Sequence, residues 1–205
     1  MSIWDKPVSH GEILKKAWKH LDMGTLDRRH PFHTPVFGTV EEGDDAAPGL
    51  RVVVLRRFWR RPPRLAFHTH LGSPKIREIR ANPRVSWLFY HPEEKLQLRI
   101  RGRAIIHTDD DLAEEQWFAT EFFSRRCYTG EAPTQISKKP TSGLPEDLTD
   151  REPTAEESEA GRANFAVISS TVDYLDCLEL DVKGNRRSLF IWKEDGESEM
   201  RWLTP

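Results

Sequence analysis

The sequence predicts a mainly β fold with flanking helices, in which antiparallel strands close or nearly close into a barrel. Short segments rich in β-branched and aromatic residues recur along the chain, separated by Gly, Pro, Asn and Asp. Helical periodicity is confined to three stretches. Closure is expected because it removes the unpaired edges that an open sheet leaves exposed.

Length and composition are those of one domain with a core of ordinary size. The chain has 205 residues, of which 37% are hydrophobic. Its 31 Lys and Arg residues nearly balance 33 Asp and Glu residues, and the formal net charge is -2. We therefore expect no overall basic field and neither a nucleic-acid nor a membrane partner.

The chain shows no apolar run of the kind that exports a protein or spans a bilayer, and we expect a cytoplasmic protein. Cys127 and Cys177 are far apart and form no Cys-x-x-Cys pair. Neither a zinc knuckle nor a disulfide framework is indicated, so both thiols are expected to be reduced.

The first half of the chain begins with a helix and continues with strands. Residues 9–23 have apolar side chains at helical spacing, with Ser9 as the cap and Gly24 as the stop. Residues 35–40 and 50–59 are predicted to be two strands joined by an acidic loop, which would make a hairpin.

A third strand is predicted at residues 65–70, followed by a short helix that begins at Ser73-Pro74 and ends at Asn82-Pro83. Residues 85–90 and 96–107 supply further strands. In the second of these, apolar and polar positions alternate, which predicts one buried and one polar face.

The second half contains a helix at 109–123 and then a loop-like insertion at about 128–163, rich in Pro, Thr, Ser and acidic residues. Strands follow at 165–181, 187–192 and 200–203. The turns between these strands are predicted at Lys183-Gly184-Asn185 and at Asp195-Gly196. We expect a single domain over residues 1–205.

The triplet Ser73-Pro74-Lys75 indicates a helix N-terminus that can bind an anion. The helix dipole penalises a cation at this end by roughly 0.3–1 kcal/mol, so Lys75 should face a negative group. The alternative is an ordinary solvated lysine.

Arg51 and Arg56 flank four apolar residues, and strand alternation would send their side chains to opposite faces. Both can reach one ligand only if the strand twists or bulges. Arginine binds phosphate in bidentate fashion, and together with the helix start at Ser73 these residues favour a phosphate site over solvated arginines.

Five segments, in this order, resemble the FMN-binding core of the pyridoxamine 5'-phosphate oxidase-related split-barrel flavoproteins. They are the run from Arg51 to Arg56, Phe67-His68-Thr69, Ser73-Pro74-Lys75, Asn82-Pro83, and Gln97-Leu98-Arg99-Ile100-Arg101-Gly102.

This resemblance implies an FMN-binding split β-barrel of Greek-key type that forms a homodimer with the flavin at the subunit interface. It implies that Arg51 and Lys75 hold the phosphate, that the strand after Arg51 follows the flavin, and that Gln97 approaches the ring. The implied cofactor-binding residues are Arg51, Val52, Val53, Val54, Leu55, Arg56, His68, Thr69, Ser73, Lys75, Gln97 and Arg187. No catalytic residue and no metal is assigned.

The chain also departs from the oxidases that act on vitamin B6. Lys183 and Asn185 stand where those enzymes have an Arg-x-His pair, and Phe122 lies near the position of their substrate-binding Tyr. The resemblance therefore implies a related FMN-dependent oxidoreductase whose small-molecule substrate is unassigned. FMN would transfer hydride while the protein sets orientation and access.

Two alternatives use the same residues differently. A non-catalytic protein that binds or stores FMN would have the same cofactor motifs. A metal-binding barrel would use His68 and His70, which share a strand face, with His91 and His107 nearby. Arg99 and Arg101 are expected either to contact cofactor or substrate, or to form surface ion pairs.

Overall fold

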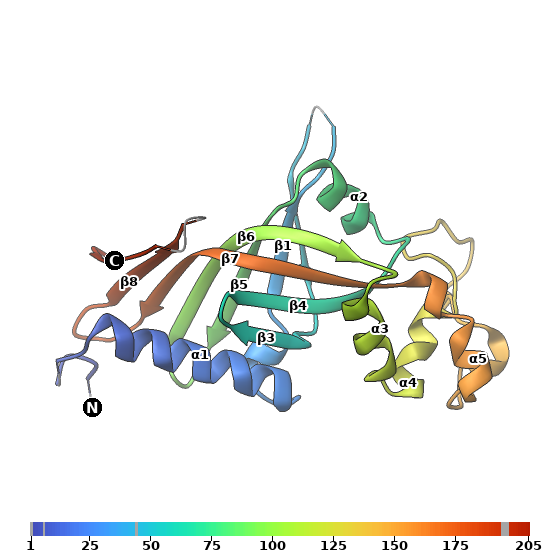
Figure 1. The fold of residues 1–205 in the computed structure, drawn as a ribbon, viewed down its shortest axis with the longest axis horizontal. Coiled ribbons are helices and arrows are strands. Elements are labelled where there is room, and N and C mark those ends of the chain that lie inside the picture. The colour runs from blue at the N-terminus through green and yellow to red at the C-terminus, as the bar shows by residue number, and fades with distance from the viewer. Residues whose placement is uncertain (1, 6, 44, 194–196) are drawn as a thin grey trace.

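The computed structural model describes residues 2–5, 7–43, 45–193 and 197–205. Its centre is one antiparallel sheet, in which the long strands β6 and β7 run across the molecule (Figure 1). The strands are β1 (Val36–Val40), β2 (Pro48–Val52), β3 (Arg57–Arg60), β4 (Pro63–His70), β5 (Arg84–His91), β6 (Leu96–His107), β7 (Phe165–Glu179), β8 (Arg186–Trp192) and β9 (Ser198–Leu203).

Helices flank this sheet. In Figure 1, α1 lies beneath it, α2 lies above it, and α3 to α5 gather at one end. They are α1 (His10–Leu26), α2 (Pro74–Ala81), α3 (Asp111–Phe118), α4 (Phe122–Arg125) and α5 (Ala155–Glu159), with short 3-10 turns at Pro31–His33 (η1), Arg126–Tyr128, Glu146–Leu148 and Arg162–Asn164. None of the helices described is long and apolar enough to cross a membrane.

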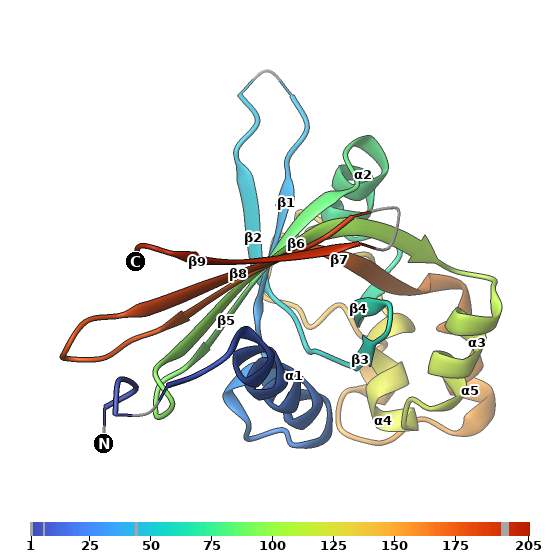
Figure 2. The ribbon, with the colours of Figure 1, turned by 60° about the vertical axis from the view of Figure 1, so that its left-hand side comes forward.

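The sheet divides along β7. The strand order is β2-β1-β5-β6-β7-β4-β3, and β8 also pairs with β7. The first part of β7, to Thr171, pairs with β4, while the part from Tyr174 onward pairs with β8. In Figure 2 the branch formed by β4 and β3 and the branch formed by β8 and β9 lie on opposite sides of the centre. The mainly β, split-barrel prediction is confirmed.

Gly102 allows β6 to remain paired with β7 where the sheet divides. The register shifts between Arg101 and Gly102, and a Cβ at Gly102 would overlap the Thr171 carbonyl. Glycine is required for this close approach of two backbones.

Alternation along the strands gives the sheet a buried and an outer face. On β6, Leu96, Leu98 and Ile100 are buried, while Arg99 and Arg101 are exposed, as predicted. The buried face packs with α1 into the main core, whose largest side chains include Trp87, Phe32, Phe37, Phe67, Phe89 and Phe190.

Helix α1 begins as predicted but ends later. Ser9 and Glu12 form a reciprocal capping box. The helix continues past Gly24 to Leu26, so the stop predicted at Gly24 is wrong. Gly24 instead makes room for the next segment, because a Cβ there would lie 2.8 Å from the Phe32 carbonyl oxygen.

The single strand predicted at 50–59 is also wrong. β2 ends at Val52, β3 begins at Arg57, and the intervening segment changes partners. The Val53 N–H donates to Pro35, whereas the Arg56 N–H donates to Ala66 on β4. The sequence could not predict this change of partner strand, because the β-branched residues that indicate a strand continue through the segment without a break.

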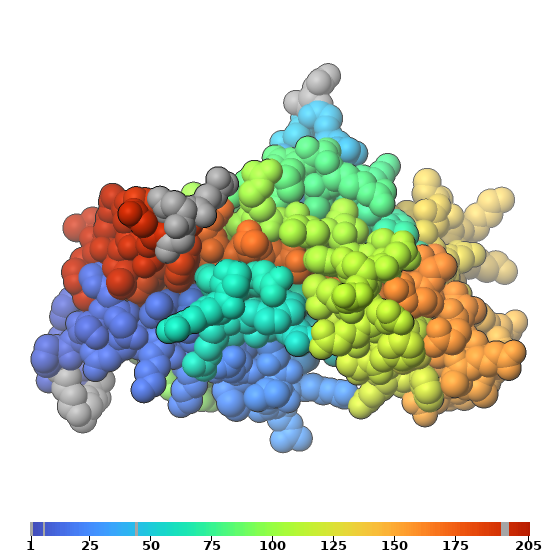
Figure 3. Space-filling view, in the orientation of Figure 1, coloured from blue at the N-terminus to red at the C-terminus, as the bar shows by residue number. Residues whose placement is uncertain are grey.

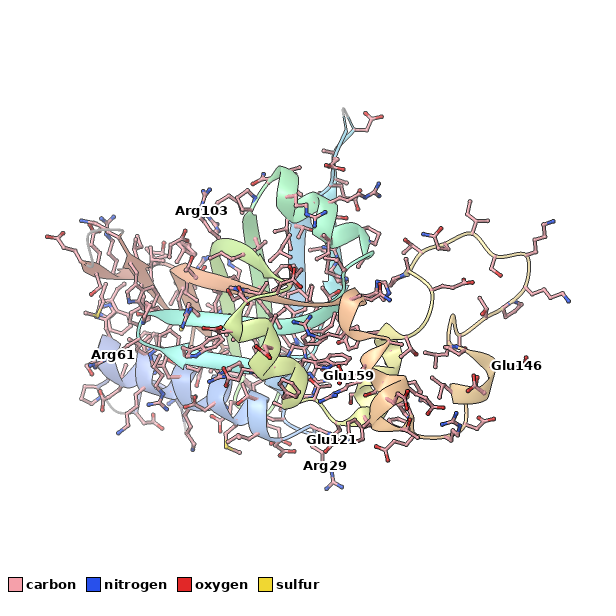
Figure 4. All side chains as sticks on the ribbon, turned by 45° about the vertical axis from the view of Figure 1, so that its right-hand side comes forward. Arg29, Arg61, Arg103, Glu121, Glu146 and Glu159 are labelled. Atoms are coloured by element: carbon pink, nitrogen blue, oxygen red, sulfur yellow. The ribbon has the colours of Figure 1, made fainter. Side chains whose placement is uncertain are left out.

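The helix predicted at 109–123 is interrupted after Phe118, and the insertion contains short helical turns. These elements form a block at the right of Figure 3. Glu159, labelled in Figure 4, accepts hydrogen bonds from Arg125 Nη1 at 3.0 Å and Trp117 Nε1 at 3.1 Å. The predicted turn at Asp195-Gly196 lies outside the described residues.

Candidate functional site

Lys75 lies at the start of α2, with its ammonium group directed back to the end of β4. Lys75 Nζ donates to Thr69 Oγ1 at 3.1 Å and to Ser73 Oγ. Ser73 is the N-cap by position, yet its side chain makes no capping hydrogen bond. Strand end and helix start thus place two hydroxyls and a cation together, and these three residues are among those that the resemblance implies for the phosphate site.

The charge of Lys75 is destabilised where it lies. Burial and, to a smaller extent, the nearby positive charge of Arg51 lower the pKa of Lys75 to about 8, against the opposing effect of Glu78. A bound phosphate would supply the negative charge that restores this pKa.

Arg51 reaches the same helix from β2. Its Nη2 forms an ion pair with Glu78 Oε2 at 2.8 Å, and its Nη1 donates to the Gly49 carbonyl at 2.7 Å. Thr39 on β1 accepts from Arg51 and donates to Glu78. Arg51 and Lys75 therefore both lie near the buried carboxylate of Glu78.

A hollow of about 300 Å³ opens beside Lys75. The segment that crosses between β2 and β3 supplies one wall, and the end of β4 supplies another. Leu55 is fully buried in the core and does not line this hollow. The lining residues are Val52, Val53, Val54, Arg56, Phe67, His68, Thr69, Lys75 and Tyr128.

His68 contributes a neutral imidazole to this wall. Its Nε2 lies 3.2 Å from Gln116 Oε1, and its buried Nδ1 has no hydrogen-bond partner. Burial, with a smaller contribution from the charge of Arg56, lowers the pKa of His68 to about 4. The ring packs edge-on against Phe165.

Tyr128 is a lining residue that the sequence did not predict. It stands at the start of the insertion, packs against Trp117 and Phe165, and burial raises the pKa of its hydroxyl. No local pattern marks it, because the fold of the insertion brings it to the hollow.

Gln97 and Arg187 lie elsewhere within the chain. Each pairs in register with Leu178 on β7, so both share the outer face of the sheet. Arg187 and Arg99 form ion pairs with Asp176 at 2.7 and 2.8 Å. Arg101 lies over the Tyr174 ring.

The histidines considered as metal ligands from the sequence are not brought together among the described residues. His70 Nδ1 accepts from the Gly72 N–H, and His107 pairs with Asp110 and Ser169. His91, also considered from the sequence, lies instead with His20 and His30, and these three are close enough for shared coordination.

Comparison with known proteins agrees with this geometry. Residues 12–108 match the family described as "Pyridoxamine 5'-phosphate oxidase, FMN-binding domain". A pyridoxine/pyridoxamine 5'-phosphate oxidase of Rubrobacter xylanophilus is 40% identical over 76 residues, 37% of this chain. That of Nitrobacter winogradskyi is 36% identical over the same length. These matches cover 33% and 34% of the relatives' own lengths.

Two solved structures share the whole fold. A pyridoxamine 5'-phosphate oxidase-related, FMN-binding protein of Nostoc punctiforme has a TM-score of 0.74 and covers 98% of this chain and 100% of its own. PhzG of Burkholderia lata, solved with tetrahydrophenazine-1-carboxylic acid, has a TM-score of 0.68 and covers 98% and 95%. Both are 18% identical to this chain.

The resemblance found in the sequence is confirmed. Residues 12–108 match an FMN-binding domain of the pyridoxamine 5'-phosphate oxidase family, and the fold is the split barrel of the solved structures. The residues present suit that cofactor: a partly buried ammonium with two hydroxyls suits a phosphate, and the valine wall suits a flat apolar ring.

Proposed function

We propose that this protein is an FMN-dependent oxidoreductase whose flavin phosphate binds at Lys75, Ser73 and Thr69, with Arg51 close behind. The supporting observation is the position of Lys75, a partly buried cation that donates to two hydroxyls at a helix N-terminus beside a hollow. FMN would supply hydride transfer, and the protein would bind and orient the reactants.

Within this proposal the crossing segment 52–54 supports the flavin ring, and His68 is a neutral polar neighbour. Arg56 lines the hollow with an exposed side chain. It is free to meet an anionic group of cofactor or substrate. Leu55 stabilises this wall from the core side rather than contacting the flavin.

We propose further that two copies complete the site. Exposed apolar side chains on β2 and β5 share the outer sheet face with Gln97 and Arg187. Their exposed fractions run from 40% for Leu88 to 67% for Leu50. A second copy packed on this face would bury the patch and would bring its Gln97 and Arg187 toward the flavin.

The substrate proposed is a small molecule other than a B6 vitamer. Lys183 and Asn185 lie in the turn between β7 and β8, where Gly184 has a φ of 115°. The turn thus carries one cation and an amide in place of the arginine and histidine of the B6 oxidases. One domain with an insertion at 128–163 remains our proposal for the organisation of the chain.

Cofactor binding tests the proposal directly. Lys75→Ala should bind FMN about tenfold to a hundredfold more weakly, the range expected for a lost charge-assisted hydrogen bond. Arg77→Ala is the matched control, because Arg77 lies on the same helix but is exposed and outside the hollow. Equal affinities in the two variants would remove Lys75 from the site.

Catalysis needs a separate measurement. Absorption bands of oxidised flavin in the purified protein would show the cofactor, and bleaching by NADH or NADPH would show that it accepts electrons. Bound flavin that neither nicotinamide reduces would favour the storage alternative. At a hundredfold excess over its dissociation constant, FMN should add about 2.7 kcal/mol to the free energy of unfolding. Riboflavin, which lacks the phosphate, should add much less.

A further inference from the structure

Three histidines from separate parts of the chain meet beside α1, away from the flavin hollow. His20 lies on α1, His30 precedes η1, and His91 is the last residue of β5. One ring nitrogen of each lies within 4.8 Å of those of the other two. His20 Nδ1 and His30 Nε2 are 3.2 Å apart.

We propose that His20, His30 and His91 bind a divalent transition-metal ion of the Zn²⁺ class, which ties α1 to the end of β5. Two ligands on a tetrahedral zinc with bonds of roughly 2.0–2.1 Å lie a little more than 3 Å apart, close to the separation of the first pair. Three imidazoles with a fourth position for water form a recognised zinc site, whereas Mg²⁺ and Ca²⁺ prefer oxygen ligands.

The surroundings of the trio keep the rings in place, and burial disfavours the charged forms of His20 and His30. His20 and His91 are buried, and all three rings contact the fully buried ring of Phe32. Burial, followed by the neighbouring His91 and His30, lowers the pKa of His20 to about 4. Neutral imidazole is the form that coordinates a metal.

The charges facing the trio favour a cation. The negative charge of Glu94 acts on His20 and His91, and that of Asp27 acts on His30. Lys16 is an opposing cation, but Glu94 and Glu179 pair with it at 3.0 and 3.5 Å. A divalent ion at the trio would therefore find compensating carboxylates nearby.

Protons compete with the metal for these nitrogens. The Phe32 and Glu94 N–H groups donate to Nδ1 of His30 and His91, so the neutral rings carry their protons on Nε2. The His30 Nε2–H then donates to His20 Nδ1. Coordination through Nε2 shifts each proton to Nδ1 and breaks two weak backbone contacts, a small loss beside the binding free energy of zinc.

Metal binding can be measured without any assay of activity. FMN-loaded protein is stripped with a chelator and dialysed against Zn²⁺, and bound metal is determined by elemental analysis. We expect one zinc per chain and a higher melting temperature with zinc. Cobalt substitution should give the visible absorption of a tetrahedral site. A wild-type protein that retains no zinc overturns the proposal.

Variants locate the metal. His30→Gln and His91→Gln should each weaken zinc binding by more than the roughly tenfold to hundredfold that loss of an outer-shell partner costs. His107→Gln is the matched control, since His107 and Asp110 form the type of surface pair that collects metal adventitiously. Retained FMN absorbance shows that a variant has folded. If His91→Gln fails to fold, His30→Gln still tests the proposal, because His30 is partly exposed and its substitution disturbs the core less. Equal zinc binding in the control and in His30→Gln overturns the assignment.

Discussion

At the scale of single residues, the proposed cofactor site depends on a charge that the fold itself disfavours. Lys75 is partly buried, lies at the positive end of a helix dipole and is close to Arg51. Two hydroxyls and Glu78 compensate in part. A bound anion would stabilise the charge of such a residue, which is why we assign Lys75 to the proposed phosphate site.

The affinity for FMN should depend on pH in a way that Lys75 determines. A phosphate monoester loses its second charge below about pH 6, and Lys75 loses its proton above its pKa of about 8. Binding should therefore be strongest between these values. In Lys75→Met the decline above pH 8 should disappear, which fluorescence titration from pH 5 to 9.5 would measure. The same decline in the variant would contradict the role of Lys75.

His68 should make the protein sensitive to acid. Folding lowers the pKa of its imidazole from 6.5 to about 4, so the unfolded chain takes up a proton first as the pH falls. The free energy of unfolding should drop by about 3 kcal/mol across this interval from this group alone. In His68→Phe this contribution to the loss of unfolding free energy should be absent. Urea unfolding of the wild type and the variant at pH 7 and pH 4.5 measures the difference. An unchanged pH dependence would contradict the buried, neutral state of His68.

At the scale of elements, packing decides where regular structure stops. α1 continues through Gly24 because the preceding residues have good helical periodicity. The missing side chain of Gly24 also leaves room for Phe32 in η1. The strand signal from Leu50 to Trp59 is divided because its backbone pairs with β1 before the division and with β4 after it. That division lets Val52, Val53, Val54 and Arg56 line one hollow despite strand alternation.

Two glycines of α1 should respond in opposite directions to the same substitution. Gly11→Ala should add about 0.5–1 kcal/mol to the free energy of unfolding, because the nearest atom to the new Cβ, Ser9 Oγ, is 3.8 Å away. Gly24→Ala should remove about 1–3 kcal/mol, since its Cβ would press on the Phe32 carbonyl. Chemical denaturation measures both, and a gain at Gly24 would contradict the close contact with η1.

At the scale of the whole molecule, the two faces of the sheet differ in what covers them. One face packs with α1 into the core. The other carries exposed Leu50, Val52, Leu88 and Tyr90 beside the arginines of β6 and β8. An apolar area of this kind, continuous with proposed cofactor ligands, fits the dimer interface that we propose.

Leu88→Glu should therefore yield a monomer that binds FMN more weakly. The new carboxylate would lie opposite Arg99 on the outer face, and a dimer could form there only by removing it from water. Light scattering gives the mass, and flavin titration gives the affinity. Phe118→Glu is the control, because Phe118 is 66% exposed on α3 and away from this face. A dimer that survives Leu88→Glu would place the interface elsewhere.

Much of this architecture follows from the sequence. The strand at 96–107, its alternation, the caps at Ser9 and Ser73 and the turn at Gly184 all depend on neighbours within a few residues. For that reason their local pattern predicts them. The cation and hydroxyls around Lys75 were predicted for the same reason, since three of these residues lie within seven positions.

The rest depends on contacts between distant segments. The partner exchange at 53–56, the place of Tyr128 and the Glu78 bridge to Arg51 each join residues far apart in sequence. The meeting of His20, His30 and His91 spans 71 residues from first to last, with no motif in between. Local periodicity and short motifs predict most of the strands, the cap at Ser9 and the resemblance to FMN-binding proteins, because each of these depends on neighbouring residues. Which side chains share a cavity depends instead on how distant backbones pair and pack, and no local pattern contains that information.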